Sequence, residues 1–397
     1  MGTATSKTLP GIEARRDELV AWRRDLHAHP ELAYEERRTS AFVATELRRI
    51  GLDVEVGLGR TGVVATLSTG DGPSVGLRAD MDALPIREAN DFAHRSRFDG
   101  RMHACGHDGH TIMLLAAARE LAERPRFRGT VRFVFQPAEE AAGGARAMID
   151  DGLFERFPME RVFGMHNWPG IPVGRFAMRA GPLMASIDCF DARIGGRGTH
   201  GALPHEGIDP VLAAAQTVVA LQGIVSRNVD PRRAAVLSVT KLNAGHAHNV
   251  IPEAADLSGT LRALDPSVRA LLKRRLADVV SATAAAYGAS ADVKFVFENP
   301  PVVNDSDAVA LAASAAASLV GDAAVDADAE PVLASEDFAV MLERRPGCYV
   351  FIGNGDGPSG CAIHDPSYDF NDEILTLGAS YWVRVAEAAL ASPRALG

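Results

Sequence analysis

The sequence predicts an α/β protein with a mostly parallel central sheet, into which a compact ferredoxin-like α+β domain is inserted. Strand-like runs alternate with helical segments before about residue 185 and again after about residue 299, as in a parallel sheet covered by helices. The block between them has the order β-α-β-β-α-β. A chain of 397 residues is long enough for two domains, which we place at 1–184 with 296–397, and at 185–295.

The first domain begins with two helical segments, and the second of them ends at Gly51, a residue that commonly ends helices. Farther along, Asp108 is expected to cap a helix, and Pro137 is expected to stop a strand because it has no N–H to donate. The expected helices cover 12–27, 36–50, 111–123 and 143–150, and the expected strands cover 54–56, 63–67, 75–77, 130–135 and 162–165.

The inserted domain and the C-terminal part show the same kinds of signal. Strands of β-branched and apolar residues alternate with long helical segments that begin at a proline. In the inserted domain the expected strands include 186–194, 235–241 and 254–262, and the helices are 210–227 and 266–287. After it, helices at 308–319 and 372–390 are expected around a strand at 348–352.

Charge and hydrophobicity limit the possible partners. The net charge is −10, and the paired arginines lie beside acidic residues, so no basic stripe for nucleic acid is expected. No segment approaches the roughly 20 apolar residues that span a bilayer, and the first ten residues lack the apolar run of a signal peptide. We therefore expect a cytoplasmic protein that binds neither nucleic acid nor membrane.

The segment from His103 to His110, HACGHDGH, is the most informative for function. It holds three of the twelve histidines and one of the four cysteines. Cys105 and His107 are two residues apart, so in an extended loop their side chains would point the same way and reach one ion. A thiolate beside an imidazole favours zinc, cobalt, nickel or manganese over calcium. The segment therefore predicts a site for a divalent transition metal and an activated water.

Further polar residues follow strand-like runs. Asp80, Glu139, Glu140 and His166 each come just after such a run. In parallel sheets the carboxyl ends of the strands form the crevice that binds ligands. We expect these side chains to gather at one edge of the central sheet.

The segment Gly57–Gly62 matches the dinucleotide-binding pattern GxGxxG. That pattern binds a pyrophosphate only when its last glycine opens a helix. Here the following residues, 63–67, read as a strand. We therefore interpret these glycines as a hairpin turn.

Taken in order, the motifs of the chain resemble those of metal-dependent amidohydrolases of the M20 peptidase family. The resemblance is strongest to the subfamily of hippurate hydrolases, N-acyl-amino-acid amidohydrolases and plant indole-acetyl-amino-acid hydrolases, and it covers nearly the whole chain. It implies a zinc-peptidase-like catalytic domain and an inserted dimerisation (lid) domain. The matching segments are 26–32, 78–85, 102–111, 136–140, 164–167, 198–202, 249–252, 259–262, 335–338 and 364–366.

The resemblance also implies roles for individual residues. Glu139 would be the general base and acid, because the carboxylate that does not bind metal is poised to take a proton from an activated water. Asp82 would orient a ligating imidazole, although it would serve equally well to cap a turn before Pro85. Two divalent ions per subunit (Mn, Zn, Co or Ni) would be bound by Cys105, His107, Glu140, His166 and His364.

Residues of the inserted domain are implied to complete the site. His200 resembles an oxyanion-stabilising histidine that reaches the neighbouring subunit of a homodimer, or of a dimer of dimers. Asn249 and Arg262 resemble residues that hold substrate, with the planar guanidinium of Arg262 pairing with the α-carboxylate. The remaining histidines of this domain are expected on the surface or in loops: His205, His246 and His248.

These observations favour hydrolysis of the amide bond of a small-molecule N-acyl amino acid by a metal-activated water. Within the family, an N-acetyl-diaminopimelate or N-acetylcysteine deacetylase, or a dipeptidase, remains as an alternative. A nucleotide-binding oxidoreductase would instead use Gly57–Gly62 and be indifferent to chelators. A metal-binding regulator without catalysis would tolerate the loss of Glu139.

Overall fold

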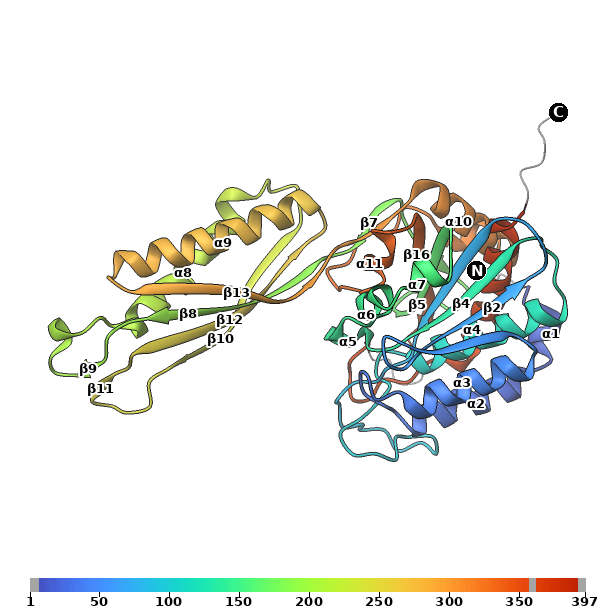
Figure 1. Ribbon diagram of the computed structural model, residues 1–397, viewed down its shortest axis with the longest axis horizontal. Helices are drawn as coiled ribbons and strands as arrows, with labels where there is room; N and C mark the ends of the chain where they lie inside the picture. Colours follow the sequence, from blue (N-terminus) through green and yellow to red (C-terminus); the bar gives the residue numbers. More distant parts are fainter. Residues whose placement is uncertain (1–6, 357–361, 392–397) are drawn as a thin grey trace. The chain divides into compact units, whose positions relative to one another are not determined.

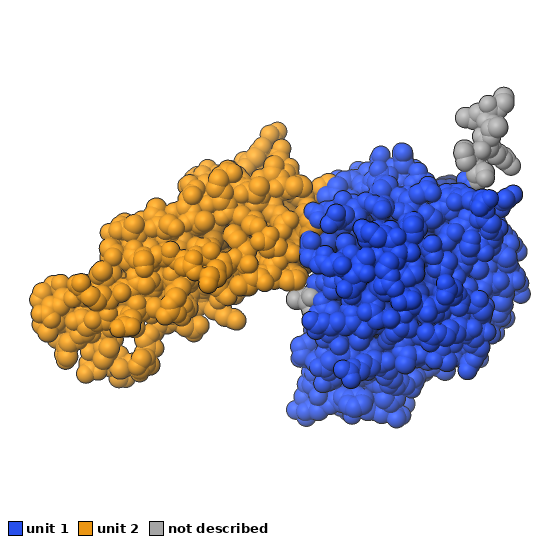
Figure 2. Space-filling model, viewed as in Figure 1, with its two compact units in different colours: residues 1–181, 303–330, 337–397 blue, residues 182–302, 331–336 orange. Residues whose placement is uncertain are grey.

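The structure, a computed structural model, describes residues 7–356 and 362–391, which divide into two compact units. Figure 2 shows unit 1 in blue (1–181, 303–330 and 337–397) and unit 2 in orange (182–302 and 331–336). Residues 296–302, which we expected in the first domain, belong to unit 2 because its last strand continues to Asn299. Residues 331–336 also belong there, since Ala185 N–H donates to the carbonyls of Val332 and Ala334.

Unit 1 is built on an eight-stranded sheet of order β1-β2-β4-β3-β5-β16-β6-β15. Its central strands β4, β3, β5 and β16 run parallel. β2 pairs antiparallel with both β1 and β4, whereas β6 pairs antiparallel with β16 and parallel with β15. This confirms the predicted α/β class (Figure 1). The strands are β1 (Asp53–Leu58), β2 (Gly62–Ser68), β3 (Ser74–Asp80), β4 (Thr130–Gln136), β5 (Arg161–Pro169), β6 (Phe176–Ala177), β15 (Val325–Asp326) and β16 (Gly347–Gly355).

The helices of unit 1 pack against this sheet and against one another. α4 packs against α12 and against β3, α2 packs on α4, and α10 packs on α12. Their apolar faces join the sheet in one hydrophobic core. The helices are α1 (Pro10–Glu13), α2 (Arg16–Ala28), α3 (Arg37–Arg49), α4 (His107–Glu123), α5 (Glu139–Ala142), α6 (Gly144–Asp150), α7 (Leu153–Arg156), α10 (Ser306–Val320), α11 (Ala339–Leu342) and α12 (Leu375–Ala389), with 3₁₀ turns η2 (Asp322–Ala324) and η3 (Asp372–Ile374).

The glycine-rich segment at 57–62 is a turn between two antiparallel strands. β1 pairs with β2 in this hairpin, and Leu58 lies opposite Gly62. Gly62 is the first residue of a strand. The expected hairpin is confirmed, and the segment lacks the helix that a dinucleotide site requires.

Helix α4 begins four residues earlier than the sequence indicated, at His107 instead of Thr111. Gly106 precedes it in the left-handed conformation (φ 91°), and an ideal Cβ there would lie 2.3 Å from Asn167 Oδ1. Only glycine fits this turn. Asp108 lies inside the first turn, and its carboxylate contacts His27, so the expected capping role is wrong.

Unit 2 is a four-stranded antiparallel sheet of order β10-β12-β8-β13, with α8 and α9 packed on each other and on the sheet. This order and connectivity confirm the predicted ferredoxin-like domain. A separate core of apolar side chains lies between sheet and helices. Its elements are β8 (Ile187–Gly195), β9 (Thr199–His200), η1 (Pro204–Glu206), α8 (Pro210–Asn228), β10 (Ala235–Ala244), β11 (Val250–Ile251), β12 (Ala254–Ala263), α9 (Pro266–Ala286) and β13 (Ser290–Asn299).

Two short strands, β7 (Gly181–Met184) and β14 (Val302–Asn304), pair where the chain passes from one unit to the other. Within 7–356 and 362–391, no helix combines the length and apolar character needed to cross a bilayer.

Candidate active site

The polar residues singled out in the first domain meet at the carboxyl-terminal edge of the parallel strands of unit 1. Asp80 ends β3, and Glu139 and Glu140 follow β4. His166 lies within β5, which is parallel to both neighbours. This edge is where a parallel sheet binds ligands, as the sequence predicted.

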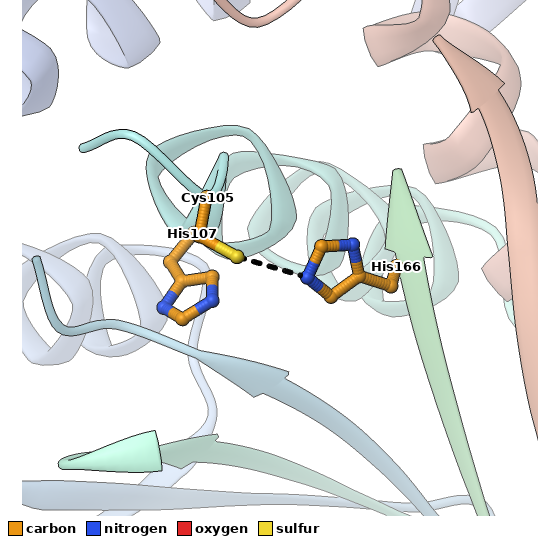
Figure 3. Close-up of side chains that lie close together, drawn as sticks. All are labelled: Cys105, His107 and His166. Carbon is orange, nitrogen blue, oxygen red and sulfur yellow. Dashed lines mark hydrogen bonds between the residues drawn. The ribbon is translucent and has the colours of Figure 1, made fainter. Parts of the chain in front are cut away.

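Cys105, His107 and His166 form the buried part of the site. Cys105 Sγ lies 3.3 Å from His166 Nε2, and one donor atom of each of the three residues lies within 4.8 Å of the others. Figure 3 shows the thiol between the two imidazole rings. The expected extended loop is wrong, because His107 is the first residue of α4; the turn at Gly106 brings the two side chains together instead.

Glu140 and His364 lie on the more open side of the same site. His364 Nε2 is 3.3 Å from Glu140 Oε1, and Cys105 is close enough to share an ion with both. The loop that carries His364 is held near Cys105, because His364 N–H donates to the carbonyl of Ala104 at 2.7 Å. The side chain of His364 is 49% exposed, so this side of the site is open to solvent.

The donor atoms fit metal ions better than they fit each other. His107 Nε2 and Glu140 Oε1 are buried and make no hydrogen bond among the described residues. Both atoms have charged groups nearby, at 3.3 to 4.0 Å, but a buried polar atom that makes no hydrogen bond is costly, so two such atoms in one cluster indicate a missing ligand. One thiol, three imidazoles and a carboxylate are the donor set of transition metals.

The electrostatics also favour a cation. Burial alone would lower the pKa of His107, but Asp80, Asp82 and Glu140 raise it to about 10, so these carboxylates favour a positive charge beside them, whether of a proton or of a metal ion that replaces it. By contrast, burial and the neighbouring His110 hold the pKa of His166 well below its usual range. His166 is therefore a neutral imidazole, the form that binds metal.

Asp82 contacts the ring of His107 on the side away from the cluster. Its carboxylate Oδ1 lies 3.2 Å and its carbonyl oxygen 2.9 Å from His107 Nδ1. The other carboxylate oxygen accepts the N–H of Glu140 at 3.0 Å. These contacts leave His107 Nε2 facing the cluster and also fix the backbone of Glu140.

Glu139 stands at the first position of α5, next to Glu140. Its Oε1 accepts the N–H of Asp337 at 3.4 Å, and a donor atom of Glu139 lies within 4.8 Å of those of His107 and Glu140. The preceding residue, Ala138, has a left-handed backbone (φ 53°, ψ 44°). This turn directs the two adjacent carboxylates toward the site.

Comparisons with known proteins agree with this geometry. Residues 76–388 match the peptidase family M20/M25/M40. The chain is 40% identical over 379 residues to the hippurate hydrolase of Campylobacter jejuni, covering 95% of this chain and 98% of that one. It is 42% identical over 373 residues to N-acetyl-L-cysteine deacetylase of Bacillus subtilis, covering 92% and 86%.

A solved structure gives the same result. A dinuclear metal-binding peptidase of the M20 family from Bacillus subtilis superposes with a TM-score of 0.82 at 36% identity, covering 95% of this chain and 99% of that one. The chain belongs to peptidase family M20/M25/M40. The resemblance drawn from the motifs is thus confirmed, and this M20 protein is a hydrolase that acts on amide bonds.

Several buried residues that support the site of this M20 hydrolase were given no role from the sequence. His110 Nδ1 lies 2.6 Å from Asp80 Oδ1, and His110 Nε2 lies 2.7 Å from Asn167 Oδ1. Both ring nitrogens are therefore engaged within the fold. The spacing of His107 and His110, three residues apart, would have placed both rings on one helix face, but only for a helix predicted to begin at His107 and not at Thr111.

A second buried group lies behind Glu139. Arg78 donates to Gln136 at 2.8 Å, to Asp80 at 2.7 Å and to Asp337 at 3.1 Å. Asp337 in turn accepts the N–H of Ala145 at 2.9 Å. These contacts connect β3, β4 and the segment after 336 beneath the site.

The predicted residues of unit 2 lie in two places within that unit. His200 pairs with Val250 in the β9–β11 ribbon, and Gly201 N–H donates to the carbonyl of Asn249, so His200 and Asn249 are neighbours. Arg262 lies near the far end of β12, and its Nη1 donates to the carbonyl of Leu333 at 2.9 Å. Three further histidines are exposed as predicted: His205, His246 and His248.

Proposed function

We propose that this M20 hydrolase cleaves the amide bond of N-acyl amino acids, such as hippurate-like, N-acetyl or aryl-acyl conjugates. The observation that carries the proposal is that one thiol, three imidazoles and one carboxylate converge beside a further carboxylate, Glu139. Two donor atoms of this cluster are buried and make no hydrogen bond among the described residues. The names of the relatives, a hippurate hydrolase and an N-acetyl-L-cysteine deacetylase, support the substrate class.

We propose that two divalent ions bind per subunit, held by Cys105, His107, Glu140, His166 and His364. Zinc, manganese, cobalt and nickel suit the combination of thiolate, imidazole and carboxylate. When bound, such ions lower the pKa of a water molecule and polarise an amide carbonyl. Asp82 would orient His107 through Nδ1 and so leave Nε2 for metal.

Glu139 would act as the general base and then the general acid. It lies within reach of the cluster but, unlike Glu140, its carboxylate also accepts a backbone N–H from Asp337. It would take a proton from the attacking water and deliver it to the amide nitrogen as the C–N bond breaks. The products are a carboxylic acid and a free amino acid.

Unit 2 would supply the remaining contacts to substrate. His200 is exposed and would donate a hydrogen bond to the developing oxyanion. Asn249, its neighbour in the β9–β11 region, and Arg262 would hold the substrate, with Arg262 pairing with the α-carboxylate.

The surface of unit 2 supports assembly with a second copy of the chain. Val211, Leu212 and Val219 are exposed along α8, and Val219 is 66% exposed. β10 is an edge strand whose neighbour in the sheet is β12, and it exposes Leu242. An apolar helix face beside an open sheet edge fits a two-fold pairing of like surfaces. We propose a homodimer, or a dimer of such dimers.

A hydrolysis screen tests the proposed function. Protein stripped with a chelator and reloaded with zinc, manganese, cobalt or nickel would be assayed on hippurate, N-acetyl amino acids including N-acetylcysteine, N-acetyl-diaminopimelate, an indole-acetyl conjugate and dipeptides. We expect metal-dependent release of free amino acid from at least one N-acyl substrate. Cleavage confined to dipeptides would refute the proposal and favour a dipeptidase, whereas N-acetylcysteine as the sole substrate would favour the deacetylase.

A further inference from the structure

We propose that Glu36 is a positioning residue for Glu139, acting through the left-handed turn at Ala138. This inference rests on the proposed function, because it assumes that Glu139 moves the proton. The residues involved come from distant parts of the chain: Glu36 lies just before α3, and Ala138 follows β4.

The left-handed conformation of Ala138 is unfavourable by itself and needs contacts with other residues to hold it. Residues other than glycine, asparagine and aspartate rarely adopt φ 53° and ψ 44°, because Cβ then crowds the following carbonyl. Ala138 is also completely buried. A small rotation at this residue would move both adjacent carboxylates, Glu139 and Glu140. Such a conformation persists only where neighbouring groups hold it.

Glu36 provides this support. Its Oε1 accepts the N–H of Ala138 at 2.8 Å and the N–H of Tyr34 at 3.0 Å, and its Oε2 accepts the hydroxyl of Thr61 at 2.6 Å. The side chain is completely buried. A buried carboxylate with three such donors is held in one orientation, so it can fix the amide that it binds.

The position of Glu36 in the sequence suggests another role, which it does not perform. It occupies the N-cap of α3, but its side chain makes no capping hydrogen bond. Glu31 caps α3 instead, because its carboxylate oxygens accept the N–H groups of Arg38 and Thr39, each at 2.9 Å. The carboxylate of Glu36 is therefore available for the turn before the proposed base.

The turn is held on its other side as well. Asp82 accepts the N–H of Glu140 at 3.0 Å, and Gly144 N–H donates to the carbonyl of Ala138 at 3.0 Å. Glu36 is thus the contact that fixes the start of the turn, while Asp82 fixes its next residues. Losing Glu36 would free the Ala138 end and leave the Glu140 end in place.

The test compares Glu36→Ala, Glu36→Gln and the matched control Glu31→Ala. Since a displacement of about 1 Å in a reacting group can cost about 100-fold, we expect Glu36→Ala to lower kcat at least about tenfold. KM and metal content per subunit should stay at wild-type values. Glu36→Gln keeps an oxygen that can accept the Ala138 N–H, so it should recover most of kcat. Glu31→Ala should lower the unfolding temperature without lowering kcat.

Hydrogen exchange gives a readout that needs no activity. Amides of residues 138–140 should exchange faster in Glu36→Ala than in wild-type protein, and no such change should occur in Glu31→Ala. If the wild-type protein hydrolyses no N-acyl amino acid while this exchange result holds, the proposed function fails and the support of the turn stands. Unchanged exchange, or wild-type kcat in Glu36→Ala, overturns the inference.

Thr61→Val is a milder variant for the case that Glu36→Ala does not fold. It keeps the branched shape of the side chain and removes the hydroxyl that Glu36 accepts. It should lower kcat by a smaller factor, again without loss of metal. A fall in kcat that matches the loss of metal in either variant would show general damage to the site and would overturn the positioning role.

Discussion

Glu139 and Glu140 are adjacent in the chain, but their side chains contact different groups. Glu140 Oε1 faces His364, whereas Glu139 Oε1 accepts an N–H from Asp337. We expect Glu139→Gln to retain metal and to lose about 10² to 10⁴ in turnover, because the amide cannot move a proton. Turnover and elemental analysis of the same sample measure both. Near-normal turnover with full metal content would contradict the assignment of Glu139 as the base.

Cys105 differs from the other described cysteines in its surroundings. Its thiol contacts His166 at 3.3 Å, while Cys189 lies in unit 2. Cys105→Ser should lower metal content, and thiol oxidants applied to metal-free protein should prevent its reactivation by added metal, whereas bound metal should protect the loaded protein. Cys189→Ser is the control and should bind metal normally. Equal metal content in the two serine variants would rule out a ligand role for Cys105.

His364 and His205 allow a matched comparison of two solvent-accessible histidines. His364 lies 3.3 Å from Glu140, whereas His205 lies in η1 of unit 2. His364→Ala should reduce metal bound per subunit, as should His166→Ala, and His205→Ala should leave it unchanged. Metal titration followed by calorimetry measures the difference. Full stoichiometry in His364→Ala would exclude the C-terminal loop from the metal site.

At the scale of elements, α2 is tied to α4 and to the loop after 362 by a buried charged cluster. Arg23 donates to Asp369 at 2.9 Å and to Asp372 at 2.7 Å. His27 lies between Asp108 and Glu88, at 2.9 and 3.3 Å. This cluster holds the first turn of α4 against the loop that carries the proposed ligand His364.

The cluster predicts a pH dependence of stability. Burial alone would lower the pKa of His27, and Arg23 also lowers it, but Asp108 and Glu88 raise it to about 9. The folded protein then binds the proton more tightly than the unfolded chain does. The resulting stabilisation, about 3 kcal/mol for a change from 6.5 to 9, is complete below pH 6.5 and lost as pH rises through 9.

Urea unfolding of wild-type protein and His27→Gln between pH 6 and 10 measures this effect. The wild-type free energy of unfolding should decline across this window more steeply than that of His27→Gln, which lacks the titrating ring. His205→Gln, altered at an exposed histidine, should follow the wild-type curve. Parallel curves for wild type and His27→Gln would show that the imidazole has no raised pKa.

The elements that the sequence predicted well are those set by local pattern. The hairpin at 57–62 follows from glycines followed by β-branched residues, and the ferredoxin-like block follows from its order of strands and helices. The left-handed turns at Gly106 and Ala138 were not predicted. The turn at Ala138 is held by Glu36, and Asn167 leaves no room for a Cβ at Gly106; both partners are far away in sequence and leave no local signal.

The sequence singled out those site residues whose combination is chemically unusual. It gave no role to supporting residues of common types. Adjacent glutamates and a cysteine among histidines suggested a metal site from the sequence alone, because thiolate, imidazole and carboxylate together suit transition metals. Asp80 and His110 look equally suited to binding metal, but the fold pairs them with each other and with Asn167. Which histidine faces the cluster depends on the rotation of α4, which is set by tertiary packing.

At the scale of the whole molecule, the proposed catalytic and binding residues are divided between the two units. The cluster of metal-binding donors and Glu139 lies in unit 1, whereas His200, Asn249 and Arg262 lie in unit 2. The exposed apolar face of α8 and the open edge of β10 lie in unit 2 as well. In the proposed dimer, which pairs through unit 2, we expect His200 of one copy to act in the site of the other, as the resemblance to the family implies.

Mixing two inactive variants tests this arrangement. His200→Ala alone should cost about 10² to 10³ in turnover without loss of metal, because one donor to the oxyanion is removed. Glu139→Gln is also inactive, but in a two-fold symmetric dimer, random exchange makes about half of the dimers mixed, each with one site holding both intact residues. Activity should therefore return after mixing. If subunit exchange is confirmed and no activity returns, His200 does not act across the interface.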